Sequence, residues 1–288
     1  MQNNIQRIFS PGDQWLYYNI FCGYNAADQI LIDHLSSLSQ SFISQNLIDQ
    51  WFFIRYNDPS YHIRYRIRLK DQEHLGLIIN TINTSLKNLI SDEYIWKLQM
   101  DTYTREIERY GASSMELAEK IFYYDSSIII NILSSLNENQ ENIRSLWALK
   151  LIDLYLSAFN FSLSEKLEFA EKLRNHFYSE FNIEKNTKKQ FDRLYNENKH
   201  AIDAFLSKKT KKINKALLAD TALKILSLKE KKRLNVDFYS LMSSFIHMSL
   251  NRLFTGDNRM HELVSYDFIW RYYKKEHYFH TSTKDHGS

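Results

Sequence analysis

The chain has 288 residues, of which 44% are hydrophobic and 25% charged, and its formal net charge is +3. This length fits one large domain or two small ones, and so small a charge does not favour general nucleic-acid binding. A single cysteine excludes an internal disulfide and a zinc site built on several cysteines. The six glycines form no phosphate loop of the GxGxxG or GxxxxGK[ST] type. Any anion site must therefore come from local clusters of cations.

The first part of the chain shows no targeting or membrane-spanning signal. The opening stretch MQNNIQRIFSPGDQW lacks the apolar core of a signal peptide. All apolar runs are far shorter than the roughly 20 residues that cross a bilayer. We expect a soluble, cytoplasmic protein with no membrane partner.

The first hundred residues alternate between strand and helix patterns. Aromatic and β-branched runs predict strands, and apolar residues at helical spacing predict helices. The predicted order is a strand at 15–23, a helix at 25–44, a strand at 50–57, a strand at 61–70, a helix at 71–90 and a strand at 94–104. This β-α-β-β-α-β order is typical of a ferredoxin-like antiparallel sheet with both helices on one face.

The rest of the chain has helical periodicity from residue 114 to about 278. We therefore predict an α+β fold, with a sheet part at 1–112 and a mainly helical part at 113–280 that covers the open sheet face and forms one domain with it. A disordered tail is expected at 281–288. The helix pattern around Asp125 fits one long helix or two with a break there, and the last strongly apolar helix ends at Gly256.

The strand YHIRYRIRLK (61–70) alternates basic and apolar residues. As the third strand of this topology it lies in the middle of the sheet, so its apolar residues would face the helices and its basic residues the open face. Arg64 and Arg66 would project about 7 Å apart on that face, where two guanidinium groups could grip carboxylates. The alternative is a solvated face with cross-strand charge pairs.

Two further groups are candidates for chemistry. In DTYTREIERYG (101–111), Arg105, Glu106 and Arg109 lie where the last strand ends, and they fit either substrate binding or ordinary salt bridges. His247 lies in an apolar helix, SSFIHMSLNRLF, and could transfer protons if it opens into a cleft; the alternative is a hydrogen-bonded core histidine. The other histidines have no HxxxH or HExxH spacing, so no metal site is expected. The run KKTKK (208–212) fits a solvated helix face better than a nucleic-acid contact.

Four segments, WFFIRYNDPSYHIRYRIR, DTYTREIERYG, MELAEKIFYYDSS and HMSLNRLF, together resemble the C-terminal region of class I lanthipeptide dehydratases. They are also similar to stand-alone proteins of thiopeptide-type bacteriocin biosynthesis. The resemblance runs from residue 15 to about 273. It implies a separate elimination subunit of a split dehydratase, a lyase that removes glutamate from glutamylated Ser and Thr of a precursor peptide and leaves dehydroalanine or dehydrobutyrine.

The resemblance also implies roles for particular residues. Arg64 and Arg66 would contact the glutamyl adduct and the developing charge, and His247 would transfer the proton. Arg109 and Arg105 would belong to the substrate-binding set, with Arg109 holding a glutamate carboxylate, and Glu106 would anchor the adduct's amine or orient the arginines. No cofactor is expected, because glutamyl-tRNA serves the glutamylating partner.

Two other functions stay open on the sequence. A relative of the same fold could join two dehydroalanines into a pyridine ring by a [4+2] cycloaddition, or the chain could be a non-catalytic peptide- or RNA-binding partner subunit. The expected partners are the leader-core precursor peptide and the glutamylating subunit, with a lanthionine cyclase and a homodimer as further possibilities. No direct contact with nucleic acid is expected.

Overall fold

The computed structural model describes residues 5–136, 140–208 and 215–285. Its main sheet is antiparallel and has the order β3-β4-β2-β5, so the predicted third strand lies between its expected neighbours. The strands are β2 (Trp15–Cys22), β3 (Ile48–Tyr56), β4 (His62–Leu69) and β5 (Ile95–Met100). The ferredoxin-like order is confirmed. A small second sheet, which the sequence did not predict, pairs β1 (Ile8–Phe9) with β6 (Tyr103–Thr104).

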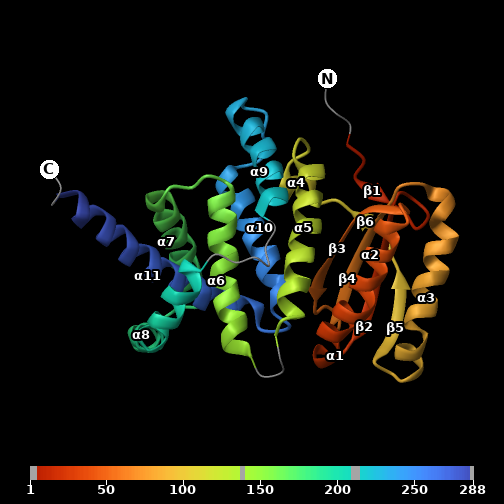
Figure 1. The fold of residues 1–288 in the computed structure, drawn as a ribbon, viewed down its shortest axis with the longest axis horizontal. Helices are drawn as coiled ribbons and strands as arrows, with labels where there is room; N and C mark the ends of the chain where they lie inside the picture. The colour runs from red at the N-terminus through yellow and green to blue at the C-terminus, as the bar shows by residue number, and fades with distance from the viewer. Residues whose placement is uncertain (1–4, 137–139, 209–214, 286–288) are drawn as a thin grey trace.

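One face of the main sheet packs against the helices of the sheet part (Figure 1). The first predicted helix is continuous but changes its winding, and consists of α1 (Tyr24–Gln29), the π-helical η1 (Ile30–Ser36) and α2 (Ser37–Ser44). The second begins with a short 3₁₀ turn, η2 (Gln72–His74), and continues as α3 (Leu75–Ser91). On β4, Ile63, Tyr65, Ile67 and Leu69 are fully buried. The Tyr65 hydroxyl lies 2.6 Å from the Ser39 hydroxyl of α2. The alternation predicted for this strand is therefore confirmed.

The second half of the chain is helical, as predicted. Its helices are α4 (Ile107–Tyr110), α5 (Met115–Leu133), α6 (Glu141–Ala158), α7 (Leu163–Glu180), α8 (Lys185–Ser207), α9 (Lys215–Glu230), α10 (Phe238–Leu253) and α11 (Asn258–Asp285). Helix α5 runs through Asp125 without a break. None of the helices in the described part of the chain combines the length and apolar character that a membrane span needs.

Two expectations about the polar segments have different outcomes. The tail predicted to be disordered from residue 281 is helical as far as Asp285, because α11 continues to that point; residues 286–288 lie outside the described residues. In the run KKTKK, Lys208 is exposed at the end of α8, and residues 209–212 lie outside the described residues.

The helical part joins the sheet at the edge strand β3, beside which α5 and α10 pack (Figure 1). An edge strand has outward backbone groups with no strand partner. Here side chains supply the missing partners: the Phe53 N–H donates to the Ser126 hydroxyl at 3.2 Å, and Arg252 Nε donates to the Phe53 carbonyl at 2.7 Å. The Asn251 amide bonds both the N–H and the carbonyl of Arg55, each at 3.0 Å. The motif residues Ser126, Asn251 and Arg252 therefore hold the helical part to the sheet part through hydrogen bonds to β3.

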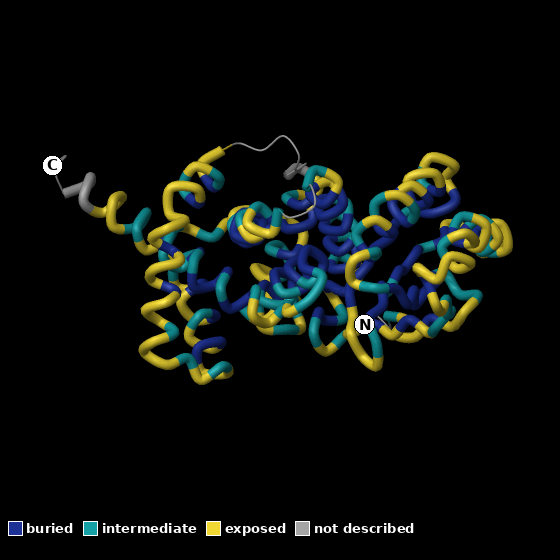
Figure 2. Tube along the Cα trace, turned by 90° about the horizontal axis from the view of Figure 1, so that it is seen from below, coloured by how far each residue is buried: buried dark blue, intermediate teal, exposed yellow. Residues whose placement is uncertain are grey.

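The buried contacts continue from these hydrogen bonds on β3 to the open face of the sheet. Arg252 Nη1 bonds the Asp125 carboxylate at 2.9 Å, and both side chains are 1% exposed. Phe122 of α5 packs against Phe52 on the open face, with ring centroids 5.3 Å apart. Figure 2 shows buried segments running from the sheet part into the helical part. The helices thus reach the open face from its β3 side.

Removing the hydroxyl of Ser126 should destabilise the protein, because it leaves the buried Phe53 N–H without an acceptor. We expect Ser126→Ala to lower the free energy of unfolding by about 1–3 kcal/mol, measured by urea denaturation. Ser127→Ala is the matched control, since that hydroxyl only bonds the Tyr123 carbonyl one turn back; its effect should stay within about 0.5 kcal/mol. Equal effects of the two substitutions would contradict the edge-strand role.

Candidate functional site

Arg66 is a buried cation with no ionic partner in the part of the chain that the structure describes. Its guanidinium carbon lies 4.5 Å from the ring centroid of Tyr17, 4.7 Å from that of Tyr103 and 5.3 Å from that of Phe52. The side chain is 8% exposed and its Nε has no hydrogen-bond partner. Burial lowers the pKa of Arg66, and within the described residues no carboxylate forms an ion pair with it. Such a group suits an incoming anion.

A small cavity of about 20 Å³ lies against Arg66, which is room for about one water molecule or one ligand oxygen. It is enclosed by the sheet, α5 and α10, and its polar lining comes from Arg66, Tyr103, Glu106, Tyr110 and Arg252. Arg252 is already tied to Asp125 and to the Phe53 carbonyl, with only its Nη2 left without a hydrogen-bond partner. Arg66, which forms no ion pair among the described residues, is therefore the cation that a ligand would meet without displacing a carboxylate.

Arg109 and Glu106 lie on and beside α4, close to this cavity. Arg109 Nε donates to the Ser244 hydroxyl of α10 at 3.0 Å, and Arg109 Nη1 lies 3.4 Å from Glu106 Oε2. The Arg109 side chain is 34% exposed and that of Glu106 is 58% exposed. A weak, exposed ion pair of this kind can exchange its partners for a charged ligand at little cost. The structure therefore brings Arg66, Glu106 and Arg109 to one region.

His247 follows Ser244 by one turn on α10, so the two side chains share a face of the helix. Its Nδ1 lies 2.8 Å from Glu262 Oε1 of α11. The carboxylate is 1% exposed and the imidazole 28%. When the carboxylate accepts the Nδ1 proton of a neutral ring, Nε2 carries the lone pair and can take a proton. Arg259 Nη1 lies 3.6 Å from the other oxygen of Glu262.

Arg64 lies on the same face of β4 as Arg66 but has different neighbours. Its guanidinium carbon is 3.5 Å from the ring centroid of Tyr56, and its Nε donates to His62 Nε2 at 3.2 Å. His62 Nδ1 lies 2.8 Å from the Ser60 carbonyl, to which it donates in this arrangement. Neutral His62 thus orients Arg64, and burial lowers the pKa of His62.

This lowered pKa predicts how stability depends on pH. The folded protein binds a proton at His62 less readily than the unfolded chain, whose value is near 6.5. The contribution of neutral His62 to the free energy of unfolding is therefore complete above the unfolded-state pKa and is lost as the pH falls below it. We expect the free energy of unfolding to fall more steeply between about pH 7 and pH 5 in the wild type than in His62→Gln. His176→Gln, at an exposed histidine beside Glu180, should keep the wild-type slope; equal slopes in all three proteins would contradict this account.

Arg105, which was expected in the substrate-binding set, has different partners from Arg66, Glu106 and Arg109. Its guanidinium grips Glu119 with two bonds of 2.7 and 2.6 Å and also donates to the Gln6 carbonyl. Both charged side chains are buried, and the Tyr103 hydroxyl donates to the same carboxylate. With its donors used in this way, Arg105 holds the start of the helical part onto the small sheet.

Several residues of the site were not predicted. Ser244 is three residues before His247, so the helical period could have suggested that they share a face. Glu262 lies beyond the end of α10, and no spacing rule connects it to His247. The aromatic rings around Arg66 come from β2, β3 and β6, and they meet only in the folded sheet. Among the described residues, no three His, Cys, Asp or Glu side chains are grouped so that they could hold a metal ion.

Known proteins match this chain along most of its length. Residues 15–273 match the family model described as lantibiotic biosynthesis dehydratase C-term. The chain is 29% identical to the nisin biosynthesis protein NisB of Lactococcus lactis subsp. lactis and 27% identical to the subtilin biosynthesis protein SpaB of Bacillus subtilis. These alignments cover 93% and 90% of this chain but 26% and 25% of those proteins. The chain therefore spans about a quarter of the length of these curated relatives.

Solved structures share the fold at low sequence identity. The tRNA dependent lantibiotic dehydratase MibB from Microbispora sp. 107891 superposes with a TM-score of 0.65 at 18% identity, over 91% of this chain and 28% of that one. The pyridine synthase TbtD from thiomuracin biosynthesis superposes with a TM-score of 0.62 at 13% identity, over 91% of this chain and 99% of that one. At such identities these likenesses show the fold alone. The sequence match over residues 15–273 shows that the chain belongs to the lantibiotic biosynthesis dehydratase C-terminal family.

Proposed function

We propose that this chain eliminates glutamate from glutamylated Ser and Thr residues of a precursor peptide, acting with a glutamylating partner. The observation that carries the proposal is the buried guanidinium of Arg66, which has no anionic partner among the described residues and faces a cavity edged by Glu106. The family and the relatives named for nisin and subtilin biosynthesis support a peptide substrate. The glutamyl-tRNA would be used by the partner.

The proposed reaction breaks the Cα–H and Cβ–O bonds and forms a Cα=Cβ double bond and an N–H bond on His247. His247 Nε2 takes the α-proton of the modified residue, the electron pair left behind forms the Cα=Cβ double bond, and the Cβ–O bond breaks so that glutamate leaves as a carboxylate with its electron pair. The negative charge that develops on the peptide carbonyl and on the leaving oxygen needs fixed donors. Arg64 and Arg66 supply two cations on one face of β4.

The remaining residues suit the glutamyl group itself. An ester made from an aminoacyl-tRNA uses the α-carboxyl, so the adduct keeps an ammonium group and a side-chain carboxylate. Arg109 would hold that carboxylate, exchanging its contact with Glu106 for the ligand, and the freed Glu106 would bind the ammonium. The exposure of this pair allows the exchange.

The proposal is tested by incubating the purified protein with a chemically defined glutamylated precursor peptide and following its mass. Loss of one glutamic acid per modified site, with no change in the unmodified peptide, is the expected result. Ring formation on a dehydrated peptide without loss of glutamate would replace the proposal by the [4+2] cyclase. No change in the mass of either peptide would favour the remaining alternative, a non-catalytic binding subunit.

A further inference from the structure

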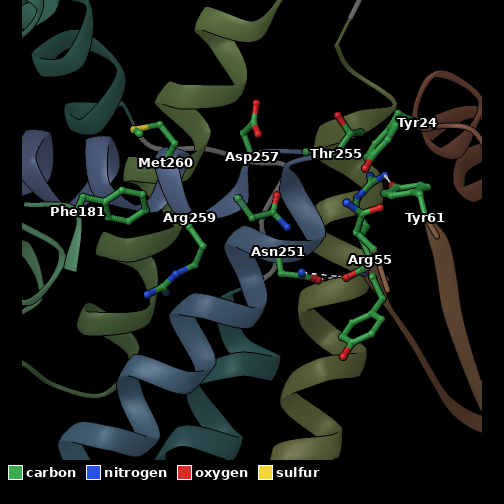
Figure 3. Close-up of a pocket in the computed structure, with 13 residues that line it drawn as sticks. Tyr24, Arg55, Tyr61, Phe181, Asn251, Thr255, Asp257, Arg259 and Met260 are labelled. Carbon is green, nitrogen blue, oxygen red and sulfur yellow. Dashed lines mark hydrogen bonds between the residues drawn. The ribbon is translucent and has the colours of Figure 1, made fainter. Parts of the chain in front are cut away.

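A pocket of about 810 Å³ opens at the end of β3, where α10 passes into α11. Figure 3 shows Tyr24, Arg55, Tyr61 and Thr255 on one side and Phe181, Arg259 and Met260 on the other, with Asn251 and Asp257 between them. A volume of this size is typical of ligand-binding pockets. The roles proposed above for Arg66, Arg109 and His247 do not use it.

The walls of this pocket are joined to the proposed catalytic groups. Asn251 follows His247 by one turn on the same face of α10. Arg259 contacts Glu262, which bonds His247 Nδ1. On the sheet side, Tyr56 lines the pocket and carries the guanidinium of Arg64 on its ring. The pocket wall therefore contacts Arg64 directly, through Tyr56, and reaches His247 through Arg259 and Glu262.

The two arginines that line the pocket are already paired, whereas the carboxylate of Asp257, which also lines it, is exposed to solvent and forms no ion pair among the described residues. Arg55 is bonded to Asp28, the Tyr61 hydroxyl and the Arg252 carbonyl. Arg259 is paired with Glu180 and Glu262. The pocket thus offers no spare guanidinium to a phosphate or a carboxylate, in contrast to Arg66.

The other lining groups are aromatic rings and side-chain amides. The rings of Tyr24 and Tyr61 lie 4.2 Å apart, and Tyr24 is 43% exposed. Asn57 and Asn258 also line the pocket, and an amide can both donate to and accept from a peptide backbone. Apolar faces beside such amides suit an uncharged stretch of polypeptide.

We propose that this pocket binds the uncharged residues of the precursor peptide that flank the glutamylated residue, an inference that rests on the proposed function. The glutamyl group would lie towards Arg66 and Arg109, the reacting Cα beside His247, and the neighbouring peptide along Tyr24 and Thr255. Affinity for the peptide would then come from the pocket, and chemistry from the arginine and histidine groups.

The test compares two synthetic substrates. The minimal one is N-acetyl-alanyl-(O-glutamyl)seryl-alanine amide, and the extended one adds several uncharged residues on each side. Thr255→Trp, which fills the pocket, should raise KM for the extended substrate by about tenfold or more and leave kcat unchanged. The kcat/KM for the minimal substrate should change by less than about twofold. Thr84→Trp, on the exposed side of α3, is the control and should behave as the wild type.

A direct binding measurement keeps this test independent of elimination. The extended peptide without glutamate, labelled with fluorescein, should bind the wild type and lose about tenfold in affinity with Thr255→Trp. If the tryptophan variant fails to fold, Tyr24→Ala replaces it in the test; this substitution, at a half-exposed ring, should weaken binding in the same way. If the labelled peptide binds but no elimination occurs, the proposed function fails and the pocket remains a peptide site. Wild-type binding and KM in both pocket variants would overturn the inference.

Discussion

Replacing Arg66 by methionine is expected to slow glutamate elimination strongly while leaving the free energy of unfolding unchanged or higher. The guanidinium is buried among Tyr17, Phe52 and Tyr103 and forms no ion pair with any described residue. A methionine side chain fits the same apolar surroundings without the cost of removing a charge from water. The loss of a donor aimed at developing charge should slow elimination by about 10²–10³-fold or more.

Arg105→Met is the matched control, because Arg105 is an equally buried arginine on a neighbouring segment. Its removal leaves the Glu119 carboxylate buried without its cation, and we expect a loss of about 3–5 kcal/mol in the free energy of unfolding. Elimination per folded molecule should persist. Chemical denaturation and the mass assay separate the two outcomes. If Arg66→Met destabilised the protein as much as Arg105→Met, or eliminated glutamate at the wild-type rate, Arg66 would be structural.

Arg66→Lys separates the role of the positive charge from that of the guanidinium geometry. Lysine keeps the positive charge, but its ammonium group cannot present two parallel donors to a carboxylate or to the oxygens of the reacting ester. We therefore expect the lysine variant to accumulate glutamylated peptide beside the glutamylating partner. Recovery of most activity by lysine would show that only the charge at this position is used.

The strand order and the two faces of β4 could be predicted because their signals are local. A strand of eight residues with strict alternation fixes which side chains share a face, and the position of the strand in a β-α-β-β-α-β order fixes its place in the sheet. The two-residue strands β1 and β6 have no such period. For that reason β1 was not predicted, and β6 was taken as the end of the strand predicted at 94–104.

The site was harder to predict, because residue type does not reveal partners. Arg66 and Arg105 both follow aromatic or polar neighbours in strand-like segments. Within residues 5–136, 140–208 and 215–285, however, Arg66 has no ion pair, whereas Arg105 is paired with the buried carboxylate of Glu119. Asp125 and Arg252 lie in the motif segments MELAEKIFYYDSS and HMSLNRLF, and the sequence does not show what they contact. Only the identity of β3 as an edge strand explains why they are needed there.

The second large effect is expected at His247 and at the carboxylate that holds it. His247→Ala removes the proposed proton acceptor and should lower kcat by about 10²–10⁴-fold. Glu262→Gln keeps the shape of the buried side chain but removes the charge that faces Nδ1 at 2.8 Å. We expect it to lower kcat by at least about tenfold, with KM for the glutamylated peptide unchanged, since a carboxylate behind a histidine stabilises its protonated form.

Glu180→Gln is the control for this pair. Glu180 is bonded to the same Arg259 that contacts Glu262, but it has no contact with His247. If Glu262 acted only by holding Arg259 and the end of α7 together, Glu180→Gln should lower kcat as much as Glu262→Gln does. Wild-type kcat in Glu180→Gln, with a lower kcat and an unchanged melting temperature in Glu262→Gln, assigns the effect to the hydrogen bond on Nδ1. Equal kcat values in the wild type and Glu262→Gln would mean that His247 needs no carboxylate, or that another group takes the α-proton.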